Sequence, residues 1–339
     1  MWFRFVGISF CFLLLACSSS FLDKGRSFHT QPVSWKEIPG WQTDDLTKAL
    51  PAILNSCTKA PTKMIRFCQG LNNHVNDDNQ GLRQYFENNL KPYRVTSRGA
   101  SVGKITGYYE AELTGSRERM NGAQVPVYGQ PYDYEPNKKT YPREKIELFG
   151  IEAPVVAWAD DPVELFIAQV QGSGRLTTPS GEVIHLGYAG NNGYTFTGIG
   201  QILIDKGIDT GTARSMPAIR DWLQSHPVEA RELMRKNKRY IYFREIQGET
   251  PYGTAGVVLT PERSVAVDTT YIPMHTLMFL NTTTPDGEAI QKMVVAQDTG
   301  AAIKGAIRAD YFWGHGERAF EQAGRMNQAG SYYVLLPKE

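Results

Sequence analysis

The sequence has few of the residues that proteins use to hold metal ions. Its six histidines are scattered, and no two of its four cysteines have the CxxC spacing typical of zinc sites. Neither sign of charge is in excess, because 36 lysines and arginines face 35 aspartates and glutamates, for a net charge of +1. A nearly neutral chain gives no electrostatic reason to expect a nucleic-acid partner. We therefore expect no metal, no other cofactor and no nucleic acid.

Long apolar runs are absent except at the start of the chain. Arg4 precedes an apolar stretch over residues 6–15, which is too short to span a bilayer. A basic residue followed by a short apolar stretch is typical of a secretory signal peptide. We therefore expect residues 1–16 to be a signal peptide and exclude them from the fold.

Cys17 follows directly after this segment. The three residues before it, LLA, resemble a bacterial lipobox, which predicts that Cys17 becomes a lipidated N-terminus with stable anchoring by several acyl chains. Ser18 at the next position favours the outer membrane of a Gram-negative bacterium. Residues 17–34 are then expected to be a lipidated tether facing the periplasm. The alternative is an ordinary signal peptide with a chance cysteine.

Two cysteines remain once Cys11 is lost with the signal peptide and Cys17 is lipidated. Cys57 and Cys68 are an even pair in a compartment that we expect to be oxidising. A disulfide that closes this short loop stabilises a fold by about 3 kcal/mol in the chain-entropy model. The sequence leaves open whether the two cysteines are bridged.

Abundant glycine, proline and tyrosine indicate the fold class. The chain has 32 glycines, 19 prolines and 17 tyrosines in 339 residues, which favours short strands and turns and suggests two domains. Helices are expected after Asp45, with a break at Pro51, and over residues 80–89. Further helices are expected over residues 194–206, 216–225 and 227–237. The chain is therefore predicted to be mostly β with minor α.

Three aspartates lie in neighbouring apolar runs of the last third. Asp268, Asp298 and Asp310 each stand where a strand-like segment meets a turn. Because alternate side chains of a strand face one side, such carboxylates can line a groove while their apolar neighbours fill a core. The alternative for Asp268 is a turn residue that caps its own backbone.

Asp310 has neighbours suited to proton transfer. Tyr311, Phe312 and Trp313 follow it, and burial beside apolar groups raises the pKa of a carboxyl group. Arg308 stands two residues earlier, on the same face of a strand, and a nearby cation lowers that pKa. The two effects oppose each other, so the local sequence does not decide the direction.

Several segments resemble the membrane-bound lytic transglycosylases of the A type. The family's three-aspartate domain is similar to LTPERSVAVDTTYIP, VAQDTGAAIKGAIRADYFWGHG and AGRMNQAGSYYVLLP. Its insert domain is similar, in order and spacing, to GYYEAEL, DDPVELFIAQVQGSGRL, GYAGNNGYTFTGIGQILIDKG and NKRYIYFRE. The resemblance covers roughly residues 36–337.

This resemblance implies a fold and a substrate. The fold is a double-psi β-barrel domain with a second β-rich domain inserted in it and a groove between the two. The barrel domain, with its N-terminal helices, is expected over residues 35–108 and 245–339, and its three-aspartate part over 259–337. The insert is expected over residues 109–244. The expected substrate is the glycan strand of peptidoglycan.

The resemblance also implies the chemistry. A single acid, here Asp310, protonates the glycosidic oxygen between N-acetylmuramic acid and N-acetylglucosamine and then, as a base, takes the proton of the muramyl C6 hydroxyl. That oxygen closes on C1 and gives a 1,6-anhydro product without water. Asp298, twelve residues earlier, orients a backbone turn or the substrate. The loop between the two aspartates is one residue longer than the shorter family spacing, and Ala301 replaces a common glycine.

Residues that bind the glycan are expected in two further stretches. Glutamine side chains can hydrogen-bond sugar hydroxyls or acetamido groups, and glycines let a backbone approach a ligand closely. The candidates are Tyr108, Tyr109, Glu110, Gln169, Gln171, Gly172, Ser173 and Gly174, with Asp268 as a further contact. The alternatives are a surface or hinge role for Glu110 and a tight turn after a strand for residues 169–176.

Three functions are compatible with the sequence. The first is a lytic transglycosylase. The second is a glycoside hydrolase in which Asp298 or Glu110 activates water, since such enzymes use two carboxylates. The third is a non-catalytic peptidoglycan-binding lipoprotein. The expected partners are glycan strands, the membrane through the lipid anchor and cell-wall remodelling proteins, and the lack of a heptad run favours a monomer.

Overall fold

The computed structural model describes residues 28–122, 124–208, 215–248 and 251–338. The predicted signal peptide over residues 1–16 and the predicted lipidation site, Cys17, lie outside the described residues. Within these ranges no helix combines the length and the apolar character needed to cross a bilayer.

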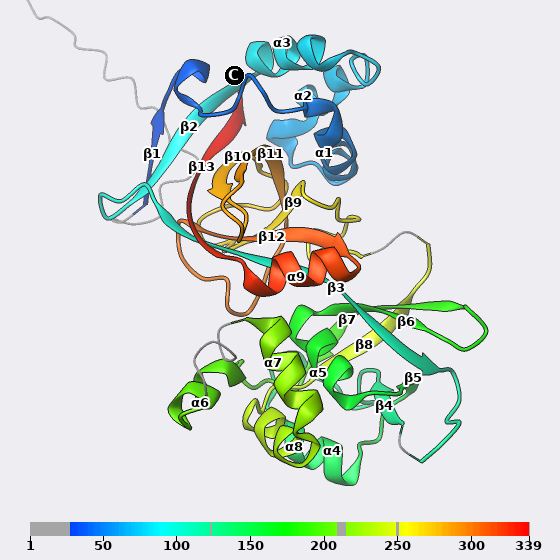
Figure 1. Ribbon diagram of the computed structural model, residues 1–339. Helices are drawn as coiled ribbons and strands as arrows, with labels where there is room; N and C mark the ends of the chain where they lie inside the picture. Colours follow the sequence, from blue (N-terminus) through cyan, green and yellow to red (C-terminus); the bar gives the residue numbers. More distant parts are fainter. Residues whose placement is uncertain (1–27, 123, 209–214, 249–250, 339) are drawn as a thin grey trace, which may run out of the picture.

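The chain forms two lobes that share the long strand β3 (Gly103–Ser116), as Figure 1 shows. The terminal lobe is built from both ends of the chain, and the inserted lobe is built from the middle. Strands of the terminal lobe follow the order β1-β2-β13-β10-β11-β9-β12-β3, and the sheet continues through β3 to β6, β7 and β8 of the inserted lobe. The prediction of a mostly β chain with some helices is confirmed.

The terminal lobe holds the three predicted aspartates. Its other strands are β1 (Phe28–Pro32), β2 (Leu90–Ser97), β9 (Ser264–Val267), β10 (Leu277–Thr283), β11 (Ala289–Asp298), β12 (Arg308–His315) and β13 (Asn327–Pro337). Strand β3 runs parallel to β12, and β9 runs parallel to β11 and antiparallel to β12. Helix α9 (Glu317–Arg325) follows β12 and packs against β3.

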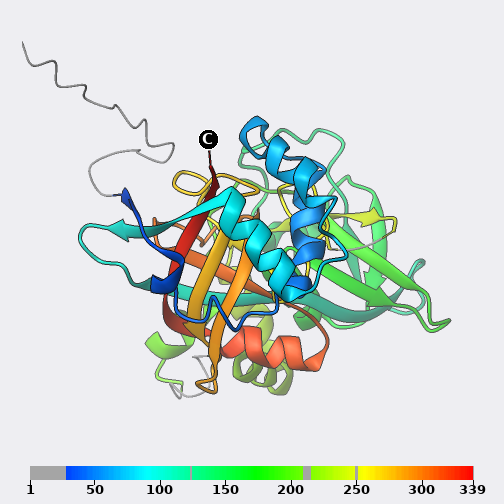
Figure 2. The same cartoon turned by 90° about the horizontal axis from the view of Figure 1, so that it is seen from above.

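Three helices cover one side of this lobe, as the view from above shows (Figure 2). They are α1 (Leu50–Cys57), α2 (Ile65–Leu71) and α3 (Asn79–Asn89), preceded by short 3-10 turns η1 (Trp35–Glu37), η2 (Leu46–Ala49) and η3 (Thr62–Met64). Their apolar faces pack on β10, β11 and β13 around a core that includes Trp41, Phe86 and Phe279. The expected break occurs one residue before Pro51, because Asp45 caps only the 3-10 turn η2 and α1 begins at Leu50.

One disulfide and one buried ion pair hold these helices in place. Cys57 at the end of α1 and Cys68 in α2 form a disulfide. Asp44, just before η2, accepts hydrogen bonds at 2.9 Å from both terminal nitrogens of Arg263 and one at 2.7 Å from the backbone of Met293. Both charged side chains are buried, so the pair ties the helical region to the three-aspartate strands from inside the protein.

The inserted lobe combines a small sheet with helices. Its strands are β4 (Val125–Tyr128), β5 (Val155–Ala159), β6 (Ser173–Thr177), β7 (Val183–Asn191) and β8 (Ile241–Ile246). Its helices are α4 (Arg143–Phe149), α5 (Pro162–Gln171), α6 (Ile199–Asp205), α7 (Met216–Ser225) and α8 (Pro227–Lys236). The predicted helix over 194–206 begins only at Ile199, and α4 and α9 were not predicted.

The stretch before Gly172 differs from its prediction, because it is a helix and not a strand. Asp161 accepts a hydrogen bond from the backbone of Val163 and so caps α5, and Pro162 occupies the first turn. Gly172 ends the helix with a φ of 88°, a left-handed conformation that glycine adopts without strain. The tight turn that was the alternative interpretation of this stretch is therefore a helix C-cap.

The C-terminal end of the predicted tether also differs. Residues 28–32 form strand β1, which pairs antiparallel with β2 over Tyr93 to Ser97. Phe28 is buried, and its ring lies 5.5 Å from that of Tyr271. The burial of this aromatic side chain holds the segment in the fold, so the residues of the predicted tether from Phe28 onward belong to the terminal lobe.

Candidate active site

Two of the three aspartates stand in one row that crosses four neighbouring strands. Asp298 on β11 is paired with Ala266 on β9, which is paired with Asp310 on β12, which is paired with Thr106 on β3. Residues directly opposite one another in a sheet project from the same face. Ala266, which has a small side chain, lies between the two aspartates. The backbones of Asp298 and Asp310 are therefore about 9–10 Å apart, which is two strand spacings.

An apolar cluster lies beside this row on the same face of the sheet. Tyr108 is two residues after Thr106 on β3, and its ring centroid lies 5.1 Å from that of its cross-strand partner Phe312. Leu259 and Ile303 complete the cluster with Ala266. Carboxyl groups on this face therefore have buried apolar neighbours, which disfavour their charged form.

Asp310 is held by a short chain of hydrogen bonds. The Thr106 hydroxyl donates to the Asp310 carboxylate, and Arg308 donates to the same hydroxyl at 2.8 Å. Burial raises the pKa of Asp310, while the Thr106 hydrogen bond and the Arg308 and Lys104 cations oppose the rise and the charge of Asp298 adds to it. The net pKa is raised, so burial outweighs the predicted effect of Arg308 and favours a protonated acid.

Asp298 also has a raised pKa. Burial is the main cause, and it exceeds the opposing effect of two backbone donors, Thr254 and Thr299, which each lie 2.9 Å from Oδ1. The Tyr108 hydroxyl lies beside Asp298, and burial together with the charges of both aspartates raises the pKa of this tyrosine. The three acidic groups are thus electrostatically coupled within one site.

Glu110 lies further along the same strand, four residues after Thr106. It is only 1% exposed and lies between the two lobes, 3.5 Å from Arg175 of β6 and 4.0 Å from His185 of β7. A carboxylate enclosed by a guanidinium and an imidazole is part of an ionic cluster on β3. The structure therefore places Glu110 where β3 joins the sheet of the inserted lobe.

Tyr109 and the predicted glutamines form internal contacts of the fold. The ring of Tyr109 lies 5.4 Å from that of Phe320 on α9, and its backbone nitrogen donates to Gln171 at 3.2 Å. Gln169 is buried and donates to the backbone of Ile241 at 3.3 Å. These contacts join β3 and β8 to α5.

The glycines of this stretch have different structural roles. Gly172 is the helix cap described above, and an added Cβ there meets no atom within 4 Å. Ser173 and Gly174 begin β6, where Gly174 pairs with Ala111 of β3. A Cβ on Gly174 lies only 2.9 Å from the Leu113 side chain, so this glycine serves the packing of β6 on β3.

Asp268 has the geometry of its alternative interpretation, a turn cap. Its carboxylate accepts backbone hydrogen bonds from Thr270 at 3.0 Å and from Gly305 at 2.9 Å. Burial alone raises the pKa of this group, but the backbone donors and the Lys304 cation outweigh burial and lower it. Asp268 therefore stays ionised and fixes the loop that leads into β12.

Sequence reasoning missed Thr106, Ala266 and Thr254. Thr106 contacts an aspartate 204 residues away along the chain, and Thr254 contacts one 44 residues away. No local pattern marks such residues. A signal for Thr106 was nevertheless present, since it precedes Tyr108 by two residues and so shares a strand face with it.

Comparison with known proteins identifies the family. Residues 104–244 match the model of the MltA specific insert domain, and residues 263–336 match the 3D domain. A crystal structure of MltA from Neisseria gonorrhoeae is 31% identical and superposes with a TM-score of 0.82 over 93% of this chain and 94% of that chain. This chain belongs to the membrane-bound lytic murein transglycosylase A family.

Two further relatives agree with this family membership. The lytic transglycosylase LtgG of Burkholderia pseudomallei is 38% identical, with a TM-score of 0.66 over 91% of this chain and 96% of that chain. The membrane-bound lytic murein transglycosylase A homolog of Buchnera aphidicola is 32% identical over 241 residues, which are 68% of this chain and 66% of the relative. Three residues of the aspartate row, Ala266, Asp298 and Asp310, lie in the 3D domain, and the fourth, Thr106, lies on β3.

Replacing Thr106 with valine tests the control of Asp310 by its neighbours. Loss of the hydroxyl removes a hydrogen bond that lowers the Asp310 pKa, so that pKa rises further. If Asp310 must be protonated to act, activity falls as pH rises through this pKa, and the alkaline limb of the pH–rate profile is expected to move to higher pH. Thr114→Val, an exposed change on the same strand, is the control and leaves the limb in place.

Proposed function

We propose that this protein is a peptidoglycan lytic transglycosylase that cleaves the β-1,4 bond between N-acetylmuramic acid and N-acetylglucosamine and releases a 1,6-anhydromuramic acid end. Family membership supports the reaction class. The observation that carries the assignment to residues is the carboxyl group of Asp310, which has a raised pKa, accepts a hydrogen bond from Thr106 and lies beside a buried apolar cluster.

Asp310 acts first as the acid in this proposal. Its proton goes to the glycosidic oxygen, the bond to muramyl C1 breaks, and N-acetylglucosamine leaves as the alcohol. The resulting carboxylate then takes the proton of the muramyl C6 hydroxyl, whose oxygen bonds to C1. One carboxyl group serves both steps and no water is consumed, in contrast to the two-carboxylate hydrolases.

Asp298 and Tyr108 orient the reacting groups. Asp298 is anchored by two backbone donors, which hold one carboxylate oxygen and leave the other for substrate or for Tyr108. Its negative charge also raises the pKa of Asp310 and so favours the acid form needed at the start of the cycle.

The proposal includes the setting of the site. The terminal lobe is a double-psi β-barrel over residues 35–108 and 245–339, the insert spans 109–244, and the glycan lies in a groove between them. Tyr108 belongs to the catalytic end of that groove. Residue 17 carries the lipid anchor that holds the enzyme at the outer membrane, facing peptidoglycan in the periplasm.

Product analysis tests the reaction class. Purified sacculi are digested with the protein lacking its first 17 residues, and the soluble muropeptides are weighed by mass spectrometry. Products one water lighter than hydrolysis products, with no reducing muramic acid, are expected. Reducing products would instead support a hydrolase, and binding without soluble products would support a non-catalytic wall-binding protein.

A two-carboxylate hydrolase is the second candidate, and the aspartate row itself favours it. Asp298 and Asp310 share a face across two strand spacings, and inverting hydrolases place their carboxyl groups about 6.5–9.5 Å apart with room for a water. The end group of the product separates the two candidates, because only hydrolysis incorporates oxygen from labelled water.

A further inference from the structure

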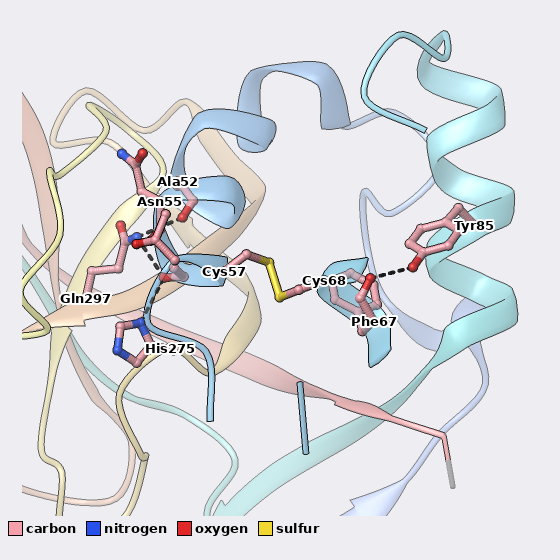
Figure 3. Close-up of a disulfide and its surroundings, with 10 residues drawn as sticks. Ala52, Asn55, Cys57, Phe67, Cys68, Tyr85, His275 and Gln297 are labelled. Carbon is pink, nitrogen blue, oxygen red and sulfur yellow. Dashed lines mark hydrogen bonds between the residues drawn. A yellow bond between two sulfur atoms is a disulfide. The ribbon is translucent and has the colours of Figure 1, made fainter. Parts of the chain in front are cut away.

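A buried hydrogen-bond cluster joins helix α1 to the end of β11, at the residue that directly precedes Asp298 (Figure 3). Gln297 is 0% exposed and uses its whole side-chain amide there. Its nitrogen donates at 2.8 Å to the backbone oxygen of Ala52 and to the hydroxyl of Ser56, and its oxygen accepts from Ser264 at 2.6 Å. His275 lies 3.2 Å from the same Ser56 hydroxyl.

The backbone is irregular at this residue. Strand β11 pairs with β9 through Ala296 and Val265 and then through Asp298 and Ala266, so Gln297 has no partner in the register. A bulge of this kind adds one residue to a strand and re-aims the side chains that follow it. Gln297 therefore points to α1, and Asp298 enters the row beside Ala266.

The same helix also holds the loop that caps Asp298. The Gln297 backbone oxygen accepts from Ala255 at 3.1 Å, and Thr254 next to it donates to Asp298 at 2.9 Å. Asn55 of α1 donates to the backbone oxygen of Val258 at 3.0 Å, at the far end of this loop. Helix α1 thus fixes both the strand that carries Asp298 and the loop that binds its carboxylate.

We propose that Gln297 is a positioning residue for the active site, holding Asp298 in the aspartate row by anchoring the bulge to α1. The preceding residues of the strand, Val294 to Ala296, are apolar and buried, as packing alone requires. A fully hydrogen-bonded amide at the next position adds directional bonds that an apolar side chain cannot supply. The inference rests on the proposed function, because it assigns a partner to Asp298 within that site.

The test replaces Gln297 with methionine, which keeps the side-chain length and removes the three hydrogen bonds. Gln124 in the inserted lobe provides a matched control, since it is also buried and also makes three side-chain hydrogen bonds, to Met120, Ser116 and Asp160. Gln297→Met and Gln124→Met are compared with the wild-type protein for melting temperature, kcat and KM on soluble glycan strands, well below both melting temperatures.

The proposal predicts a loss of kcat for Gln297→Met of about 10- to 100-fold with KM within about threefold, since a small misplacement of a reacting group has that effect. Gln124→Met is expected to lower the melting temperature by a similar amount while kcat stays within about twofold of wild type. Equal kcat values for the two variants at matched stability would overturn the positioning role.

Ser56→Ala adds a second, independent readout. It removes one of the three bonds of Gln297, so a smaller loss of kcat is expected, and the double variant with Gln297→Met is expected to be no slower than Gln297→Met alone. If the losses of kcat in the two single variants add up in the double variant, Ser56 does not act through its hydrogen bond to Gln297. If the wild-type protein releases no anhydro product, the proposed function itself fails. If the wild-type protein is active but Gln297→Met and Gln124→Met have equal kcat values, only this inference fails.

Discussion

Replacing Asp310 with asparagine is expected to slow glycan cleavage by about 100- to 10,000-fold, the usual contribution of general acid–base catalysis. Asparagine keeps the shape of the side chain and can still accept the Thr106 hydrogen bond, but it has no proton to give to the glycosidic oxygen. Glycan binding is expected to persist. Turnover of soluble glycan strands and a pull-down on sacculi measure the two effects separately.

The same substitution is expected to stabilise the fold at neutral pH. The folded-state pKa of Asp310 is raised above that of the unfolded chain, so the folded state binds more protons and its stability falls as pH rises between the two values. Asparagine does not ionise, so Asp310→Asn does not lose this stability as the pH rises. The gain in melting temperature over wild type is expected to be largest near neutral pH and to vanish below the unfolded pKa of about 3.9.

Asp268→Asn is the matched control with the opposite sign. Its folded pKa is lowered, so its carboxylate contributes stability that is present above the unfolded pKa and is lost as pH falls through the folded pKa. Asp268→Asn is therefore expected to lower the melting temperature at neutral pH.

Near-normal turnover of Asp310→Asn would contradict its role as the acid. A greater loss of turnover in Asp298→Asn than in Asp310→Asn would exchange the roles of the two aspartates.

Replacing Asp44 with alanine is expected to destabilise the fold by about 3–5 kcal/mol, the usual effect of removing one partner of a buried ion pair. Arg263 would keep its charge inside the protein without the two 2.9 Å bonds to Asp44, and the backbone of Met293 would lose its acceptor. Urea unfolding at fixed pH measures this change through the midpoint at constant slope.

Two companion variants define the origin of that loss. Asp286→Ala removes an exposed partner of Arg325 and is expected to leave the midpoint nearly unchanged, since exposed pairs contribute little. Asp44→Leu combined with Arg263→Met removes both buried charges and is expected to be more stable than Asp44→Ala. A midpoint for Asp44→Ala equal to that of Asp286→Ala would show that the buried pair does not hold the helices in place.

The sequence predicted the parts of the site whose signals are local. Asp298 and Asp310 follow recognisable apolar and glycine-bearing motifs, and the structure brings them into one row. Tyr108, which was predicted from a motif on the same strand as Thr106, lies beside Asp298 in the structure. The sequence alone did not decide whether burial or the Arg308 cation controls the pKa of Asp310. Burial depends on residues such as Leu259 that are distant in the sequence.

Other features escaped prediction for identifiable reasons. Residues 162–171 carry helix signals, an N-capping Asp161, Pro162 in the first turn and Gly172 at the end, but a preference for strands in this part of the chain outweighed them. Glu110, Gln169 and Gly174 have residue types suited to sugar binding, and each also makes contacts within the fold. Residue type alone does not distinguish a ligand contact from a packing contact.

The pairing of Thr106 with Asp310 has a consequence for the order of folding. These residues are 204 positions apart, and β3 and β12 meet only after the whole inserted lobe has been synthesised between them. Contacts between distant segments form late, because the entropy of closing the intervening chain must be overcome first. A nascent or truncated chain that stops before β12 therefore lacks Asp310, the proposed acid, and the aspartate row is complete only when the two ends of the polypeptide have come together.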